Sequence, residues 1–307
     1  MIDVSSRFTL RQLSCLVAAC EHGGIGAAAD HLRLAQATVS AALADLERSL
    51  GVQLLVRGRG RAGRPSPAGR ELLVEARAVL AAAARLEARS TELRGDVSGS
   101  LPIGCLVTLA PVVAPSLCRA FETRWTDATV DLRTGDQQAL LDWLRDGTIA
   151  LAVTYDLGLH DDVAFEPLAT AAPYVLVAGG HPLAGAADVS LEELADERLV
   201  LLDLPLSRDY FLALFRAAGL EPRSARRVSD PELVRSLVAR GYGYTLANAR
   251  PAPTQAVDGA RLSAVPLRGP LRPPKVGLAR RAGLTSTRSA AAFAETCAEL
   301  LARWDDP

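Results

Sequence analysis

The chain has 307 residues, which is enough for two or three domains, and its composition, 49% hydrophobic and 22% charged, is that of an ordinary globular protein. The formal net charge of −1 excludes a polybasic nucleic-acid coat, and no uninterrupted apolar segment reaches the length of a membrane span. The five cysteines are odd in number, form no CxxC pair and follow no signal peptide, so we expect reduced thiols and a cytoplasmic protein.

Three helices are predicted within the first fifty residues, over residues 8–21, 26–32 and 36–49. The stretch over residues 34–50, LAQATVSAALADLERSL, places its large apolar residues in steps of four, three and four, which is one stripe of a helix. The opposite face is small and polar, and the residues there that we expect to meet DNA are Gln36, Ala37, Thr38, Ser40, Ala41 and Arg48. Two short, closely joined helices are typical of a helix-turn-helix, although alanine-rich helical hairpins also occur in ordinary protein cores.

A basic, glycine-rich turn follows the third helix. Gly51 ends the helix, residues 52–56 form a short β-prone run, and residues 57–64 read RGRGRAGR. Such a hairpin directly after a recognition helix predicts a wing that reaches phosphates or the minor groove. The expected wing contacts are Arg59, Arg61 and Arg64.

Residues 8–70 resemble the N-terminal domain of LysR-type transcriptional regulators. The matching segments, in order and without a gap, are FTLRQLSCLVAAC, GGIGAAADHL, AQATVSAALADLERSLGVQLLVR and PSPAGRELL. Two positions depart from the family pattern. Gly26 stands where a serine or threonine usually caps the second helix, and Ala41 replaces a residue that is commonly basic, so position 41 lacks the side chain that the family pattern would offer to a base.

Residues 69–93 predict one long helix with a heptad repeat. Leu72, Val79, Leu86 and Leu93 recur every seven residues, and small residues lie four positions after each of the first three. This a/d pattern implies a second helix packed closely alongside. The helix could pack on its own domain, but we favour a homodimer seam, because no other stretch of the chain offers a partner for so long a stripe.

Beyond a hinge at residues 94–100, short apolar strands alternate with helices, which predicts α/β lobes with a parallel sheet. The chain is expected to cross between two lobes near residue 166 and to return near residue 268. Residues 97–304 also resemble the effector-binding domain of LysR-type regulators, which shares its fold with the type 2 periplasmic solute-binding proteins. The predicted organisation is an α-rich winged helix-turn-helix domain (1–68), a linker and dimerisation helix (69–94) and a bilobal α/β effector-binding domain (95–307), with lobe I over about 97–165 and 268–304 and lobe II over about 166–267.

Residues that directly follow the predicted strands are candidate effector contacts, because ligands of open α/β sheets bind at the carboxyl ends of strands. The candidates are Thr108, Asp136, Thr154, Tyr155, Leu206, Ser207, Arg208 and, after a helix, Tyr242. Each could instead cap a helix or form a surface ion pair. Donors at helix starts suit an anion, whereas Asp136 would repel a multiply charged one, so we predict a partly apolar molecule with a single carboxylate or a polar neutral metabolite.

The sequence therefore predicts a DNA-binding transcriptional regulator that senses a small molecule. No nucleophile–base pair, metal-ligand spacing or phosphate loop supports an enzyme, and we expect neither a cofactor nor a metal. A solute-binding protein for transport would need a secretion signal and would have no use for a winged helix. The resemblance implies further partners, namely a second copy of the chain, assembly into a tetramer, and RNA polymerase. Cys105 is expected in the core, although a pair with Cys118 is conceivable.

Overall fold

A computed structural model describes residues 7–56, 64–92, 97–249, 251, 254–302 and 304 of the chain. These residues fall into two compact units, one within residues 1–95 together with the short segment 146–148, and the other in the rest of the chain from residue 96 onward. Among the residues described, no helix is both long enough and apolar enough to cross a membrane.

The first unit is built on four helices: α1 (Leu10–Glu21), α2 (Ile25–Leu32), α3 (Gln36–Leu50) and α4 (Pro67–Glu92). α1 begins with a capping box, in which the side chains of Thr9 and Gln12 each accept the other residue's backbone N–H. The predicted apolar stripe of α3 is buried, since Val39, Leu43 and Leu46 are 4% exposed or less. The stripe packs in one core with residues of α1 and α2, which confirms the helical pattern that the sequence predicted.

A short hairpin base joins α3 to α4. α3 ends at Gly51, whose φ of 71° is left-handed and suits glycine. Leu55 and Pro65 then form a single antiparallel bridge, and the N–H of Val56 donates to the carbonyl of Arg64 at 2.8 Å. The predicted β-prone run therefore forms the base of the expected wing.

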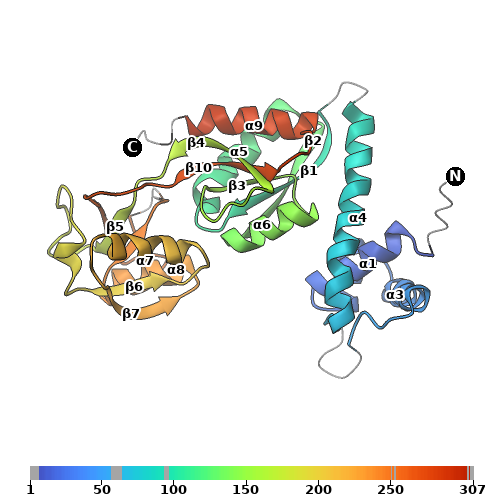
Figure 1. Ribbon diagram of the computed structural model, residues 1–307, viewed down its shortest axis with the longest axis horizontal. Helices are drawn as coiled ribbons and strands as arrows, with labels where there is room; N and C mark the ends of the chain where they lie inside the picture. Colours follow the sequence, from blue (N-terminus) through green and yellow to red (C-terminus); the bar gives the residue numbers. More distant parts are fainter. Residues whose placement is uncertain are drawn as a thin grey trace. The chain divides into compact units, whose positions relative to one another are not determined.

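The first turns of α4 pack on α1 (Figure 1). Ala76 is 4% exposed there, and Leu72 is half-buried against the same core. Arg77 adds an ion pair, with its Nη2 3.0 Å from Glu21 Oε1. The beginning of the long helix is thus fixed to its own domain.

Further along α4 the heptad residues are no longer buried against the first unit's core. Val79 is 40% exposed and Leu86 is 73% exposed, although both are large apolar residues. Leu93, the last heptad position of the sequence pattern, lies outside the described residues. The stripe therefore divides into a first part shared with the home domain and a second part that is exposed.

Lobe I of the second unit is a five-stranded sheet with helices on both faces (Figure 1). Its elements are β1 (Gly99–Leu106), α5 (Ala110–Arg124), β2 (Ala128–Gly135), α6 (Gln137–Asp146), β3 (Leu151–Tyr155), β4 (Val163–Thr170), β10 (Lys275–Arg281) and α9 (Arg288–Leu301). The strand order is β2-β1-β3-β10-β4, and β1 pairs in parallel with β2 and β3, as predicted. β10 runs antiparallel to both of its neighbours, so the complete sheet is mixed.

Lobe II holds the remaining elements, β5 (Tyr174–Ala178), η1 (Glu192–Leu194), β6 (Arg198–Leu202), α7 (Ser207–Ala217), β7 (Arg223–Val228), α8 (Pro231–Ala239), β8 (Thr245–Ala247) and β9 (Leu262–Pro266). β5 lies between β8 and β9, β6 pairs with β7, and a bridge from Leu199 to Tyr244 links the two sheets. Val175 of β5 packs with residues of α7, whereas its neighbour Leu176 packs with residues of α8. Because successive side chains of a strand point to opposite faces, α7 and α8 cover opposite faces of the lobe.

The structure differs from the sequence predictions at the two lobe crossings and at two strands. β4 runs to Thr170 and pairs with β10 along its length, so the crossing predicted near residue 166 falls inside a strand of lobe I. The chain leaves lobe I after Thr170 and returns before Lys275. β7 and β8 were not predicted from the sequence. β7 reads RSARRV at a sheet edge, where charged side chains are common and hide the apolar pattern, and β8 has only three residues.

Candidate DNA-binding surface and ligand cavity

α3 offers the surface that the sequence assigns to DNA. Gln36, Ala37, Thr38, Ser40 and Ala41 are all exposed, while the apolar stripe on the other side of the helix is buried. Four of these side chains are short, so another surface can approach the helix backbone closely, as an α-helix in the major groove requires. The exposure agrees with the assignment, and the base contacts themselves stay a prediction.

Arginines flank this surface. The Arg48 side chain is 75% exposed, and its Nη1 lies 2.8 Å from Asp45 Oδ1. Such an exposed ion pair contributes only about 0.3–0.5 kcal/mol to stability. Arg48 can therefore leave Asp45 and pair with a phosphate at a small cost in free energy. Arg64 is exposed at the base of the wing, whereas Arg59 and Arg61 lie outside the described residues.

Glu47 ties the wing to α3. Its Oε1 accepts the N–H of Leu54 at 2.8 Å and that of Leu55 at 3.2 Å. On the other side of the hairpin, the N–H of Ser66 donates to the carbonyl of Leu54 at 2.9 Å, and Ser66 Oγ accepts the N–H of Gly69 at the start of α4. A Cβ at Gly69 would lie 2.0 Å from that same carbonyl oxygen, so the position requires glycine. The base of the wing is therefore fixed to both helices.

A cavity of about 280 Å³ lies between the two lobes of the second unit. Three of the predicted effector residues, Thr108, Tyr155 and Ser207, line it. Among the lining residues that the sequence analysis did not select are Pro111, Tyr174, Tyr210, Phe211, Asp230, Glu232, Arg235, Thr245 and Asn248. Several of these follow β7 or belong to β8, the two strands that the sequence did not reveal. The walls are apolar and aromatic with a few polar groups, which is the usual make-up of a small-molecule site.

Two tyrosines of the cavity differ in their hydrogen bonding. Tyr174 donates to the carbonyl of Ala249 at 2.7 Å. The hydroxyl of Tyr155 is buried and has no hydrogen-bond partner among the described residues. Burial raises the pKa of Tyr155, and although Thr108 is near enough to lower that pKa in part, the two hydroxyls do not make a well-formed hydrogen bond. Tyr155 therefore keeps its proton and offers an unused donor.

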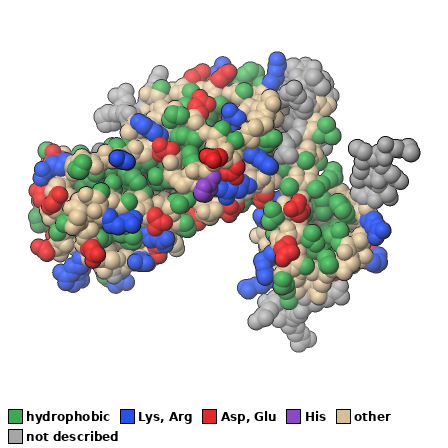
Figure 2. All heavy atoms as spheres, in the orientation of Figure 1, with side chains coloured by type: hydrophobic (Ala, Val, Ile, Leu, Met, Phe, Trp, Pro, Cys, Tyr) green, Lys and Arg blue, Asp and Glu red, His purple; other side chains and the backbone are tan. Residues whose placement is uncertain are grey.

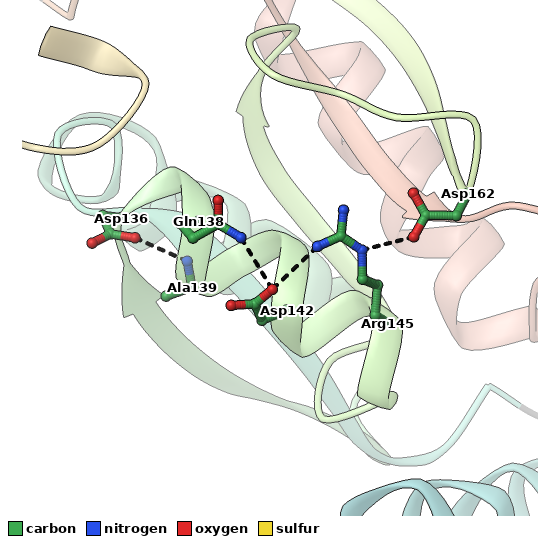
Figure 3. Close-up of polar contacts among 6 residues, drawn as sticks. All are labelled: Asp136, Gln138, Ala139, Asp142, Arg145 and Asp162. Carbon is green, nitrogen blue, oxygen red and sulfur yellow. Dashed lines mark hydrogen bonds and ion pairs between the residues drawn. The ribbon is translucent and has the colours of Figure 1, made fainter. Parts of the chain in front are cut away.

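Asp136 and Thr154, which the sequence assigns to the ligand, serve lobe I instead. Asp136 Oδ1 accepts the N–H of Ala139 at 2.9 Å and so caps the start of α6 (Figure 3). Thr154 is fully buried in β3 and donates to Oε1 of Gln137. Nε2 of Gln137 in turn donates to the carbonyl of Tyr155 at 3.0 Å. Thr154 and Gln137 hold the end of β3 in place, and neither Asp136 nor Thr154 lines the cavity.

Arg208 and Tyr242 do not line the cavity either. Arg208 pairs with two acids, since its Nη1 lies 2.9 Å from Asp203 Oδ1 and its Nε lies 3.1 Å from Asp209 Oδ1. For this residue the alternative of an ion pair is the correct one. Tyr242 is 45% exposed, and the guanidinium carbon of Arg226 lies 4.7 Å from its ring centroid. It belongs to an outer surface of lobe II.

Leu206 lies beside the cavity but packs on the opposite lobe. Its φ of 63° and ψ of −44° form a γ-turn, in which the N–H of Ser207 donates to the carbonyl of Pro205 at 2.7 Å. This backbone region is strained for any residue with a side chain. A Cβ at Gly158 would lie 2.6 Å from Leu206 Cδ1. Leu206 therefore reaches from lobe II to the β3–β4 connection of lobe I, and it does not line the cavity.

The cysteines are packing groups. All five are free thiols, so the conceivable pair between Cys105 and Cys118 is not formed. Burial raises the pKa of Cys105 to about 12 and also raises the pKa values of Cys118 and Cys297. The reactive thiolate is therefore scarce at neutral pH. In the described part of the chain, no cluster of three or more histidine, cysteine or acidic residues could hold a metal ion.

Charges of both signs are interspersed over the molecular face in Figure 2, and no single basic patch dominates it. This agrees with the net charge of −1. A molecule with so small a net charge has no strong overall field that would attract nucleic acid, so such attraction depends on local arginines.

Two family models match the chain, one described as a bacterial regulatory helix-turn-helix protein of the lysR family over residues 10–70 and one as a LysR substrate binding domain over residues 94–302. The HTH-type transcriptional regulator TfdS of Cupriavidus pinatubonensis is 35% identical over 240 residues, which cover 77% of this chain and 81% of TfdS. A probable hydrogen peroxide-inducible genes activator of Mycobacterium leprae is 30% identical over 98% of this chain and 97% of its own. The crystal structure of HinK, a LysR family transcriptional regulator from Pseudomonas aeruginosa, matches with a TM-score of 0.65 and 33% identity over 97% of this chain and 99% of HinK.

Proposed function

Since the chain belongs to the LysR family of transcriptional regulators, we propose that α3 reads an operator and that a small effector in the cavity between the lobes modulates operator binding or promoter activation. LysR-type regulators bind DNA operators and small-molecule effectors and form oligomers, and they are not enzymes. What is proposed for this chain is which residues perform each of these tasks.

We assign base contacts to Gln36, Thr38 and Ser40, because they are exposed on the small polar face of α3. Ala37 and Ala41 can offer only methyl contacts at the same surface. Phosphate contacts are assigned to four arginines that follow or end this surface, Arg48, Arg59, Arg61 and Arg64. Phosphate contacts fix the register of the protein on DNA, whereas base contacts select the sequence.

The effector assignment depends on one observation: the cavity is lined from both lobes. Thr108 and Tyr155 belong to lobe I, and Ser207 belongs to lobe II. A ligand that touches both lobes binds one arrangement of the lobes more tightly than another. A ligand shifts a conformational equilibrium only by such a difference in affinity, and each tenfold difference corresponds to about 1.4 kcal/mol.

Dimerisation is assigned to α4, through Leu72, Val79, Leu86 and Leu93. The exposure of Val79 and Leu86 supports a partner helix, because large apolar residues at heptad spacing gain most from burial in a seam. Assembly into a tetramer, contact with RNA polymerase and a cytoplasmic location are carried over from the family resemblance.

Peroxide sensing, which the name of the Mycobacterium leprae relative raises, is not assigned to this chain. Thiol-based sensing needs an accessible cysteine with a lowered pKa. Here Cys105 and Cys297 are at most 1% exposed, and burial raises the pKa of each. A non-covalent effector in the cavity fits the described residues better.

The test measures binding to DNA that the wild-type protein selects from a random library, between about 50 and 200 mM salt. Arg64→Gln should weaken binding to selected and unrelated DNA alike and reduce the salt slope by about one. Ser40→Ala should weaken binding to selected DNA only. Arg216→Gln, the same charge change on α7, is the control and should do neither. An unchanged salt slope in Arg64→Gln would remove the wing assignment, and unchanged selectivity in Ser40→Ala would remove that base contact.

A further inference from the structure

The charged side chains at the cavity already have hydrogen-bond or ion-pair partners within the protein. Three charged residues line it among those described: Asp230, Glu232 and Arg235. Asp230 Oδ1 accepts the N–H of Leu233 at 2.8 Å, which caps α8. Arg235 Nε lies 3.4 Å from Glu232 Oε1, which is an ion pair without a well-formed hydrogen bond, and Arg235 Nη2 donates to the carbonyl of Gln255 at 3.0 Å. The described lining residues carry a formal charge of −1, and Arg235 already has protein partners.

Three helices also begin at the cavity, but they offer few donors to an anion. At α5, Pro111 has no N–H, and the N–H groups of Val112 and Val113 both donate to the carbonyl of Leu109. At α8, Pro231 has no N–H, and Asp230 takes the N–H of Leu233. A helix start attracts an anion through free N–H groups, so these two starts are poor anion sites.

The start of α7 is similarly occupied. The N–H of Ser207 donates to the carbonyl of Pro205 at 2.7 Å, because of the γ-turn at Leu206. The N–H of Arg208 donates to the carbonyl of Leu204 at 2.9 Å. A carboxylate in this cavity would therefore lose its hydration without gaining a cation or a set of free backbone donors.

What the cavity does offer is an apolar enclosure with a neutral donor. Leu176, Leu202 and Phe211 contribute apolar wall, and each is at most 8% exposed. The buried hydroxyl of Tyr155 has no partner among the described residues. A buried unpaired hydroxyl is unfavourable, and an oxygen acceptor on a ligand would satisfy it.

We propose that the effector of this protein is an uncharged, largely apolar molecule of about one ring, whose carbonyl or amide oxygen accepts a hydrogen bond from Tyr155. This inference depends on the proposed role of the cavity as the effector site. It selects the neutral class over the carboxylate class, both of which the sequence allows.

The test compares probes of equal shape that differ only in charge, namely benzamide with benzoate, phenylacetamide with phenylacetate, and cinnamamide with cinnamate. Affinity for the full-length protein is measured by calorimetry at pH 7.5. At least one amide should bind ten or more times as tightly as its carboxylate. Tyr155→Phe should weaken that amide about 5- to 10-fold, the effect of one hydrogen bond, while Tyr242→Phe, the matched change outside the cavity, should leave it unchanged.

Several results would overturn the proposal: a carboxylate that binds more tightly than its amide, an amide unaffected by Tyr155→Phe, or no binding by any probe. Should Tyr155→Phe fail to fold, the amide-to-carboxylate ratio of the wild type still decides. Arg250 lies outside the described residues but next to Pro251 of the lining, so Arg250→Gln is included. If Arg250→Gln abolishes the binding of a carboxylate probe, this result refutes the neutral effector class but leaves the cavity as the effector site. Probe binding that survives Ser207→Trp, which fills the cavity, refutes the cavity as the effector site.

Discussion

Replacing Glu47 by alanine should loosen the wing without disturbing α3, the proposed recognition helix. The Glu47 carboxylate accepts the N–H of Leu54 at 2.8 Å and that of Leu55 at 3.2 Å, and both bonds are partly buried. A hydrogen bond to a charged group contributes about 1.5–3 kcal/mol. The second bond is longer, and the freed N–H groups regain some water, so we expect a local loss of about 2–3 kcal/mol rather than the sum of two full bonds.

Hydrogen exchange of individual amides measures this loss directly. With 1.36 kcal/mol for each tenfold change, the amides of Leu54 and Leu55 should exchange roughly 30 to 150 times faster in Glu47→Ala than in the wild type. The control is Glu75→Ala, the same substitution at an exposed position of α4, which should leave both amides protected. Equal exchange rates at Leu54 and Leu55 in the two variants would refute the role of Glu47 as the anchor of the wing.

Two further predictions concern assembly and pH. The double substitution Val79→Asp and Leu86→Asp would place two charges in the proposed dimer seam, at a cost of several kcal/mol in the free energy of association. Sedimentation should therefore show monomers. A folded variant that remains dimeric would contradict the proposed seam. Arg145 Nε lies 2.7 Å from Asp162 Oδ2 (Figure 3) and lowers the pKa of Asp162, so their interaction stabilises the fold above the ordinary pKa of aspartate and is lost as the pH falls through the lowered value. In an NMR titration, Arg145→Gln should raise the pKa of Asp162. The control is the pKa of Asp258, which Arg240 holds low and which should not change. An unchanged pKa of Asp162 in Arg145→Gln would contradict the pairing.

Periodicity predicted the elements of this protein better than it predicted the site. The stripe of Val39, Leu43 and Leu46 is a local property of one helix, and its burial follows from spacing alone. The parallel pairing of β1 with β2 and β3 likewise follows from alternation of strands and helices. β7 could not be predicted in this way, because an edge strand rich in arginine has no apolar alternation.

The ligand residues depended on contacts between distant segments. Thr108, Tyr155 and Ser207 line the cavity, because the carboxyl ends of strands converge there. Asp136 has the same position relative to its strand, yet its carboxylate caps the next helix. Arg208 is one residue past Ser207, but two nearby acids hold it. Spacing in the sequence identifies strand ends and cannot tell which side chain a neighbouring helix will use.

Leu54 is the point at which α3, the wing and α4 meet. Its N–H is held by Glu47 of α3, and its carbonyl accepts the N–H of Ser66, the residue before α4. The same carbonyl lies against Gly69 in the first turn of α4, where even one additional carbon would collide. These direct hydrogen bonds and the close approach at Gly69 connect α3 to the start of α4 without an intervening flexible segment. A change in how α4 packs against a partner helix would therefore move α3 as well. A dimeric regulator needs such a connection between its assembly and its binding to DNA.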